Sequence, residues 1–289
     1  MAAVTDYLKL VKFSHTIFAM PFAMTAFVYA LECGGTEVSG RDAVILLLQV
    51  VACMVFARNV AMGFNRWADR DIDKANPRTA GREIPAGVIS PDKALAFVAV
   101  NAVLFIAVAA TINRLTALLS PVALAVVMFY SYCKRFTALA HLVLGLSLGI
   151  APVGAYIAVT GHFALVPCIL SLLVMTWCAG FDIIYALQDA DFDRRNGLHS
   201  IPSRFTAPTA LGISIALHVV SVAALVWFAL CLPQSLWLWA GCAIFILLLI
   251  MQHILVTPTR QRNIGIAFGT LNGLASLALA LCVILGLLL

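Results

Sequence analysis

Charged residues are scarce in this chain: Asp, Glu, Lys and Arg make up 11% of its 289 residues, against roughly 25% in a soluble domain. Hydrophobic residues make up 63%, and the mean hydropathy is +1.03. This balance excludes an ordinary soluble protein, and it is the opposite of the bias that keeps a chain disordered. A bilayer-crossing helix needs about 20 mostly apolar residues. The chain therefore has room for several crossings and none for a separate soluble domain.

The signatures of several other classes are also missing. The eight cysteines are scattered and form no CxxC pair, so they are predicted to be small buried hydrophobic residues rather than disulfides or metal ligands. The six histidines form no HxxxH cluster. The apolar runs are continuous rather than alternating with period two, which excludes a β-barrel. No small-residue cleavage site follows the first run, which predicts a membrane helix rather than a cleaved signal peptide.

The apolar runs predict an all-α, polytopic membrane protein that forms a single domain, 1–289, with nine transmembrane helices. Of the 18 Lys and Arg residues, 15 fall at one end of these runs, two of them before the first run and the other 13 in the segments that join runs at that end. By the positive-inside rule that end is cytoplasmic, together with the N-terminus. The predicted spans are 13–31, 44–62, 94–111, 115–130, 139–159, 163–181, 209–230, 236–256 and 264–289.

Seven of the 13 acidic residues lie in two short stretches, 65–73 and 182–193, each directly after an apolar run at the predicted cytoplasmic end. Residues four apart share a helix face, so each stretch is expected to form a polar stripe if its helix continues past the membrane surface. The stripes are Asn65, Asp69 and Asp73 in the first stretch, and Asp182, Tyr185, Asp189 and Asp193 in the second.

Carboxylates on successive turns repel each other unless a cation lies between them or some stay protonated. Carboxylate and amide oxygens suit Mg²⁺, which typically takes one or two carboxylates plus substrate phosphates. The paired stripes therefore predict a Mg²⁺ site for a phosphorylated substrate; a solvated polar loop that carries Asp by chance is the simpler alternative. Basic side chains in the same layer would neutralise the remaining charge of a diphosphate. They are Arg78, Arg82, Lys134, Arg135, Arg194 and Arg195.

One basic residue, Arg58, lies inside a predicted span, seven residues before Asn65 on the same helical face. Intramembrane charges are costly and usually face the bundle interior or a wet cavity. Arg58 is therefore predicted to line a cavity rather than to reach out to the membrane interface.

Together these residues resemble the UbiA superfamily of intramembrane prenyltransferases. The first stretch is similar to the NDxxDxxxD motif of that family and the second to its DxxYxxxDxxxD motif. The segment Arg82-Glu-Ile-Pro-Ala-Gly87 is similar to RxLPxG. The segment Tyr130-Ser-Tyr-Cys-Lys-Arg-Phe-Thr137 looks like the YPxxKRxT segment of 4-hydroxybenzoate polyprenyltransferases.

The resemblance implies a central cavity, open toward the cytoplasm and the bilayer, in which Mg²⁺ bridges both motifs to a polyprenyl diphosphate. Asn65, Asp69, Asp73, Asp189 and Asp193 would hold the metal, and the same four aspartates are the candidate catalytic groups. The expected reaction is transfer of the prenyl group to an aromatic acid in quinone biosynthesis. The predicted substrate-binding residues are Arg58, Arg78, Arg82, Lys134, Arg135, Asp182 and Tyr185.

The chain departs from the family pattern at several positions. Arg66 stands where the motif has its first Asp, Ala140-His141 replaces Pro-Gln, His199 replaces a basic residue, and 13–16 reads Phe-Ser-His-Thr. These departures leave the acceptor open. The start of the chain and the stretch 134–141 look like a bacterial subgroup linked to menaquinone synthesis, whose acceptor would be 1,4-dihydroxy-6-naphthoate.

The bacterial resemblance places the protein in the inner membrane, in contact with lipid, without nucleic acid and without an obligatory protein partner. Two alternatives stay open. A cation transporter could use the Asp stripes as an ion path, although transporter carboxylates usually lie near the bilayer midplane on broken helices. A non-aromatic acceptor, such as haem or a phospholipid precursor, is the other.

Overall fold

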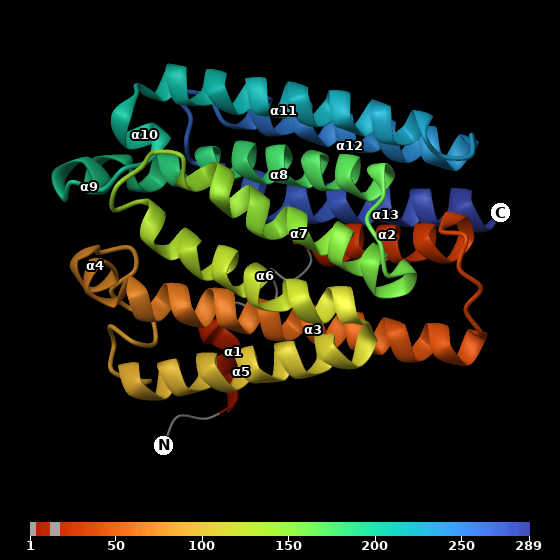
Figure 1. Cartoon of the computed structure of the whole chain (residues 1–289). Helices are drawn as coiled ribbons and strands as arrows, with labels where there is room; N and C mark the ends of the chain where they lie inside the picture. The colour runs from red at the N-terminus through yellow and green to blue at the C-terminus, as the bar shows by residue number, and fades with distance from the viewer. Residues whose placement is uncertain (1–3, 12–17) are drawn as a thin grey trace.

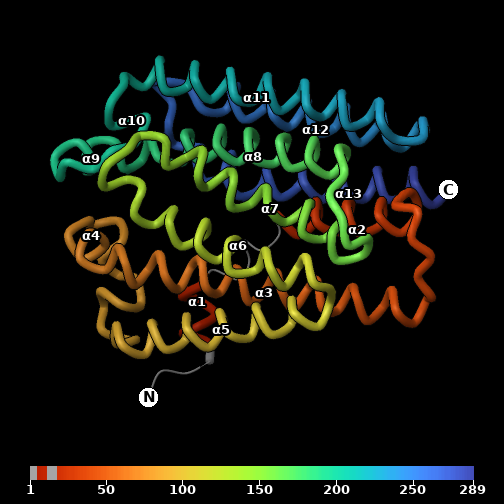
Figure 2. The backbone as a smooth tube through the Cα atoms, viewed as in Figure 1, coloured from red at the N-terminus to blue at the C-terminus, as the bar shows by residue number. Residues whose placement is uncertain are grey.

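The computed structural model describes residues 4–11 and 18–289, which form an all-α bundle (Figures 1 and 2). Its elements are α1 (Val4–Leu10), α2 (Met20–Cys33), α3 (Gly40–Ala68), α4 (Arg70–Ala75), α5 (Pro91–Ile112), α6 (Arg114–Cys133), α7 (Ala140–Thr160), α8 (Leu165–Ala186), the 3₁₀ turn η2 (Leu187–Asp189), α9 (Ala190–Arg195), α10 (Ile201–Arg204), α11 (Ala207–Leu230), α12 (Leu236–Leu255), the π-helix η3 (Ile266–Leu271) and α13 (Asn272–Leu288).

The predicted fold class is confirmed. Eight of these helices are long and apolar enough to cross a membrane, and α2 is a shorter apolar helix of 14 residues. Each predicted span overlaps one of these nine helices. The beginning of the first predicted span, residues 13–17, lies outside the described residues.

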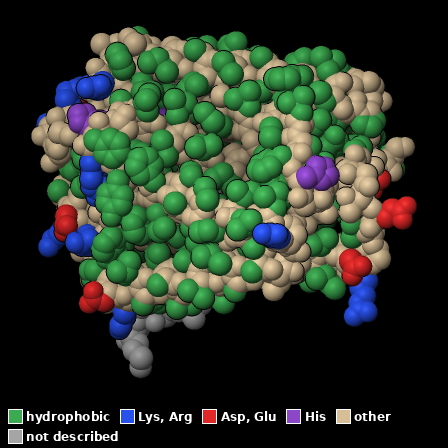
Figure 3. All heavy atoms as spheres, in the orientation of Figure 1, with side chains coloured by type: hydrophobic (Ala, Val, Ile, Leu, Met, Phe, Trp, Pro, Cys, Tyr) green, Lys and Arg blue, Asp and Glu red, His purple; other side chains and the backbone are tan. Residues whose placement is uncertain are grey.

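The long helices form two packed groups. In one group α3, α5 and α6 contact one another; in the other, α8 packs against α7 and α11, while α13 packs against α2 and α12. The α6–α7 contact joins the groups, and α2 also contacts α7 (Figure 1). Hydrophobic side chains cover the middle of the face seen in Figure 3, and most of the charged side chains in view lie toward its two ends. This is the surface expected of a protein that lies in lipid.

Local sequence explains where the helices begin and how closely they pack. Serine caps three of the long helices: Ser39, Ser90 and Ser235 accept a hydrogen bond from the first turn of α3, α5 and α12. Gly145 brings α7 against α8 so closely that a Cβ there would lie 2.1 Å from the carbonyl oxygen of Met175. Small residues permit such close backbone approach between membrane helices.

One sequence prediction about the packing is wrong in part. Cys133, Cys178, Cys242 and Cys282 are buried, as expected for small hydrophobic residues, but three others are exposed. These three lie at or near helix ends, where fewer neighbouring helices cover a side chain. They are Cys33, Cys168 and Cys231.

The bundle places both Asp stretches at the same end. The C-terminal end of α3 and α4 lie there, as do the end of α8, α9 and α10, whereas the C-terminus lies at the opposite end (Figures 1 and 2). The two motifs therefore meet across the mouth of the bundle, although more than 100 residues separate them in sequence, as the 113-residue separation of Asn76 and Asp189 illustrates.

Candidate functional site

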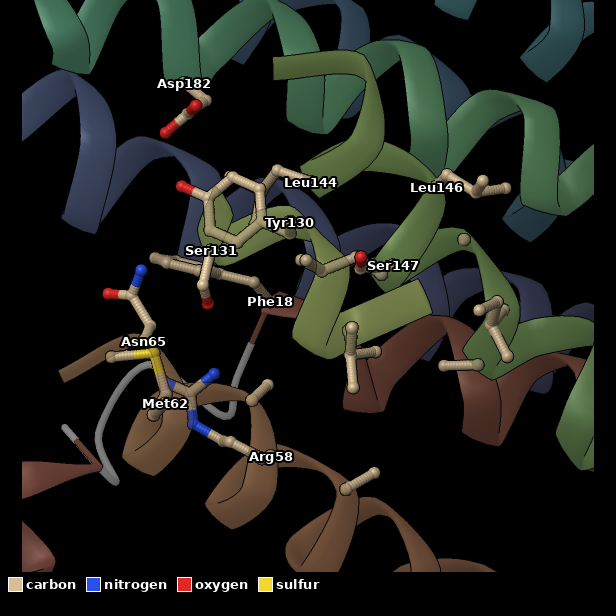
Figure 4. Close-up of a pocket in the computed structure, with 18 of the residues that line it drawn as sticks. Phe18, Arg58, Met62, Asn65, Tyr130, Ser131, Leu144, Leu146, Ser147 and Asp182 are labelled. Carbon is tan, nitrogen blue, oxygen red and sulfur yellow. The ribbon is translucent and has the colours of Figure 1, made fainter. Parts of the chain in front are cut away.

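A cavity of about 840 Å³ opens between the two helix groups. Its walls come from α3, α5, α6, α7, α8 and η3, with Phe18 at one side (Figure 4). Apolar side chains such as Met54, Leu148 and Met175 line most of it, and polar side chains of the two motifs line its other part. One continuous space thus joins a hydrophobic compartment to a charged one.

Of the twelve residues predicted for the site, all but Arg135 line this cavity; their roles stay predictions. Arg194 and Arg195, also singled out from the sequence, do not line it, and Arg194 instead pairs with the exposed Asp191 on its own helix. The cavity-lining set is Arg58, Asn65, Asp69, Asp73, Arg78, Arg82, Lys134, Asp182, Tyr185, Asp189 and Asp193.

The first motif forms the expected stripe with one interruption. The α-helix α3 ends at Ala68 and α4 begins at Arg70, yet the Asp69 N–H donates to the Asn65 carbonyl at 2.9 Å and the Asp73 N–H donates to the Asp69 carbonyl at 2.7 Å. The polar face therefore continues through the break. Asp69 and Asp73 are each only 3% exposed, so both carboxylates need partners.

Cations from other segments supply those partners. Arg82 Nη1 donates to both oxygens of Asp73, at 2.7 and 2.8 Å. Lys134 Nζ lies 3.4 Å from Asp69 Oδ2, and Arg135 Nη2 lies 3.0 Å from Asp69 Oδ1. Asn65 Nδ2 also donates to Asp69 Oδ2 at 3.1 Å. Arg135 thus reaches the first motif from behind the cavity wall rather than from within the cavity.

The second motif is tied directly to the segment that follows the first. Arg78 donates to both oxygens of Asp189, with Nε at 2.8 Å from Oδ1, and its Nη1 donates to Tyr185 Oη at 3.2 Å. Asn76 Nδ2 donates to the same Asp189 Oδ1 at 3.1 Å. Burial alone would lower the pKa of the Arg78 guanidinium, but the hydrogen bonds and charge of Asp189 outweigh it and raise that pKa.

Asp182, one turn deeper on α8, has a different partner. His141 Nδ1 lies 2.7 Å from Asp182 Oδ2, and His141 Nε2 accepts a hydrogen bond from the Ile201 N–H at 3.3 Å. Because Nε2 is the acceptor, Nδ1 carries the proton and donates it to the carboxylate. His141 is 3% exposed, and both side chains line the cavity.

Sequence reasoning missed Asn76 and Thr79 as site residues, and it mentioned Arg66 and His141 only as departures from the family pattern. All four line the cavity. Asn76 follows Asp73 by three residues, so the continued spacing was an available signal. His141 comes from α7, and nothing in its local sequence indicates its contact with Asp182.

The donor set fits a hard cation. Among residues 4–11 and 18–289 no three His, Cys, Asp or Glu side chains form a ready metal cluster, but Mg²⁺ typically takes only one or two carboxylates beside phosphate oxygens. Asp69 Oδ1 is buried and accepts no hydrogen bond from the described residues; Arg135 Nη2 lies beside it but donates to the Ala68 carbonyl at 2.7 Å. Asp69 Oδ1 is therefore available to coordinate a metal ion.

Comparisons with known proteins agree with this geometry. A sequence model described as the UbiA prenyltransferase family matches residues 19–277. Among curated relatives, a 4-hydroxybenzoate octaprenyltransferase of Idiomarina loihiensis is 32% identical over 243 residues, 83% of each chain. Another of that name, from Polynucleobacter asymbioticus, is 31% identical over 255 residues and 86% of each chain.

Solved structures show the same fold. The apo structure of a UbiA homologue from Aeropyrum pernix K1 aligns with a TM-score of 0.79 and 31% identity, over 95% of this chain and 97% of that one. A UbiA homologue from Archaeoglobus fulgidus bound to GPP and Mg²⁺ aligns with a TM-score of 0.71 and 20% identity, over 96% and 99%. The chain therefore belongs to the UbiA prenyltransferase family and is a multi-spanning membrane prenyltransferase.

Proposed function

We propose that this protein transfers a polyprenyl group from a polyprenyl diphosphate to an aromatic carboxylic acid, with 4-hydroxybenzoate as the first candidate acceptor. The observation that carries this proposal is the single cavity in which both Asp motifs adjoin a long apolar wall. Such a space suits a substrate with a charged head and a hydrocarbon tail. Curated relatives named 4-hydroxybenzoate octaprenyltransferase support the acceptor class.

The metal in this proposal is Mg²⁺, which a homologue of this fold binds together with GPP. Asn65, Asp69, Asp73, Asp189 and Asp193 would hold it. When bound, Mg²⁺ supplies positive charge that stabilises the departing diphosphate. The carboxylates that hold metal would at the same time release their present cationic partners.

The cationic side chains released in this way can then act on the substrate. As the bond between the allylic carbon and the diphosphate oxygen breaks, the electron pair leaves with the diphosphate. Arg78, Arg82 and Lys134 line the cavity and can donate to the oxygens that gain this charge. A ring carbon of the acceptor bonds to the allylic carbon, and the proton on that ring carbon then passes to the released diphosphate. The apolar wall keeps water from trapping the allylic cation.

Asp182 is the proposed proton acceptor for the hydroxyl group of the aromatic ring. It lies on the cavity wall away from the Arg78–Asp189 pair. His141 donates to one of its carboxylate oxygens, and no other described residue hydrogen-bonds to the second oxygen, which is therefore available. The runner-up acceptor, 1,4-dihydroxy-6-naphthoate, carries the same hydroxyl and carboxylate groups and would use the same contacts.

The proposal also places the motif end of the bundle at the cytoplasmic face of a bacterial inner membrane, because the sequence pattern assigns 15 of the 18 Lys and Arg residues to that face. The chain would act as a single domain, 1–289, and without an obligatory protein partner. The cation-transporter alternative is disfavoured because the carboxylates lie at one end of the bundle, and Asp69, Asp73 and Asp189 are each paired with a basic side chain.

The test compares buried and exposed aspartates within the same motifs. Asp69→Ala and Asp189→Ala should each lower Mg²⁺-dependent transfer by about 100-fold or more, because each removes a group that stabilises developing charge. Asp71→Ala and Asp191→Ala are matched controls, since these side chains are 85% and 79% exposed and do not line the cavity. Transfer is measured in proteoliposomes with a labelled prenyl diphosphate and either aromatic acid.

Full activity of both Asp69→Ala and Asp189→Ala would contradict the metal site. Failure of the wild-type protein to prenylate either aromatic acid would contradict the acceptor class. Cation flux without prenyl transfer in the same proteoliposomes would instead favour the transporter.

A further inference from the structure

Arg66 differs from Arg78, Arg82 and Lys134, which also line the cavity. It is 5% exposed, lies in the last turn of α3 and lines the cavity. Within residues 4–11 and 18–289 the structure gives it no carboxylate within 4.0 Å and no hydrogen bond from its guanidinium. Arg78, Arg82 and Lys134, by contrast, each lie beside an Asp.

A buried guanidinium without a counter-ion is costly, since removal from water is offset only by a paired anion or good hydrogen bonds. Two acidic side chains lie near enough to act on the Arg66 charge, Asp73 and Glu83, but Asp73 is engaged by Arg82, and neither lies within 4.0 Å of the Arg66 guanidinium. Arg58 lies two turns earlier on α3 and also lines the cavity, so this wall carries a second positive charge. The wall is therefore suited to an anion that the chain itself does not provide.

The opposite wall has the complementary chemistry. Figure 4 shows Arg58 and Asn65 on α3 and, across the cavity, Tyr130 with its hydroxyl and the carboxylate of Asp182. A hydroxy acid with its two groups at opposite ends of an aromatic ring matches this polarity. Its carboxylate would meet the α3 wall and its hydroxyl the Asp182 wall.

We infer that Arg66 binds the carboxylate of the aromatic acceptor and makes the enzyme select acceptors that carry one. The inference rests on the proposed function, which it deepens. A guanidinium presents a planar fork of donors that matches a carboxylate. The diphosphate has other partners, because the cations paired with Asp69, Asp73 and Asp189 become free when those aspartates bind metal. Arg66 holds no such partner to release.

Under this inference, the Arg that replaces Asp at position 66 of the first motif has a function in acceptor binding. An Asp at position 66 would add a negative charge to this wall and repel an acid. Arg66 reverses that charge, so one substitution removes an oxygen ligand and creates a site for an oxyanion.

The experiment measures selectivity between 4-hydroxybenzoate and its neutral analogue 4-hydroxybenzamide. Arg66→Gln should lower kcat/KM for the acid by about 10- to 100-fold, as loss of a charged hydrogen bond predicts, and leave the amide little changed. Arg66→Lys, which keeps the charge without the fork, should fall between. Arg70→Gln is the matched control, because Arg70 is part-exposed, stacks on Trp67 and does not line the cavity.

A binding measurement separates the inference from the proposed function. Equilibrium dialysis of the purified protein with labelled 4-hydroxybenzoate, without any prenyl donor, should show weaker binding to Arg66→Gln than to wild type. Unlabelled inorganic diphosphate is added as a competitor, because diphosphate is the other anion that Arg66 could bind. Thermal melting of each variant shows that it is folded.

The inference fails if Arg66→Gln raises KM for the prenyl diphosphate while the acid-to-amide ratio stays at the wild-type value, because Arg66 would then serve the diphosphate. Equal binding of the acid to wild type and to Arg66→Gln also overturns it. If wild type binds the acid through Arg66 but transfers no prenyl group to it, the proposed function fails and the acid site stands.

Discussion

The two helices that carry the Asp motifs are held in different ways. Only 11% of the membrane-spanning window of α3 is buried, whereas 67% is buried in the segment that contains α8. Nevertheless, of the two aspartates that an arginine bridges, the one after α3 is the more buried: the Asp73 side chain is 4% exposed and that of Asp189 is 18% exposed. Packing positions the second motif, and ion pairs with the surrounding loops position the first.

The largest effect should come from disturbing the packing around α8. Gly145→Val would push a side chain into the Met175 backbone and separate α7 from α8, with a loss of at least about 3 kcal/mol in stability. Melting in detergent, followed by intrinsic fluorescence, measures the loss.

Gly154→Ala on the same helix is the control for that substitution. No atom beyond its chain neighbours and the backbone of its own helix lies within 4 Å of the position of its Cβ, so the variant should melt at or slightly above the wild-type temperature. Wild-type melting of Gly145→Val would show that α8 is not held by this contact.

A smaller effect should distinguish the two motifs by their ion pairs. Arg82→Gln leaves the buried Asp73 carboxylate without its main partner and should cost about 3 kcal/mol. Arg78→Gln should cost about 1 kcal/mol or less, since both side chains of that pair are more exposed and Asn76 still donates to Asp189. Equal costs, measured by the same melting assay, would contradict the contrast between the motifs.

The smallest effect concerns the polar contact that ties α3 to α5. Asn59 Nδ2 donates to Asn101 Oδ1 at 2.8 Å between these helices. Asn101→Leu should cost about 1 kcal/mol, as interhelical hydrogen bonds in membranes typically do.

The double variant Asn59→Leu, Asn101→Leu provides the check. It should recover most of that loss, because no amide is then left without a partner. Additive losses in a double-mutant cycle would show that the two amides act independently.

Much of the fold was predictable because membrane helices follow directly from apolar runs. Every predicted span overlaps a helix, and the largest discrepancy at the C-terminal end of a helix is at α3, which reaches Ala68 where the run stops at residue 62. The polar residues beyond that point line the cavity or the loops around it, so hydropathy alone could not include them. The stripe of Asn65, Asp69 and Asp73 followed from helical spacing.

The partners of these residues could not be predicted in the same way. The contacts of His141 with Asp182, and of Asn76 with Asp189, join segments 41 and 113 residues apart. Spacing within a helix says nothing about which loops meet at its end. The sequence identified Arg66 only as a departure from the motif, at a position where the family has Asp. Its burial without a counter-ion among the described residues is visible only in the packed structure.

The bridge between Arg78 and Asp189 has a consequence for how the protein assembles. It closes a loop of 111 residues that contains four membrane helices, α5 to α8. Bringing such distant points together costs loop entropy that local helix formation does not. The bridge is therefore expected to form late, after these helices have inserted and packed. Engagement of Asp189 by Arg78 would then mark a chain in which α5 to α8 are assembled.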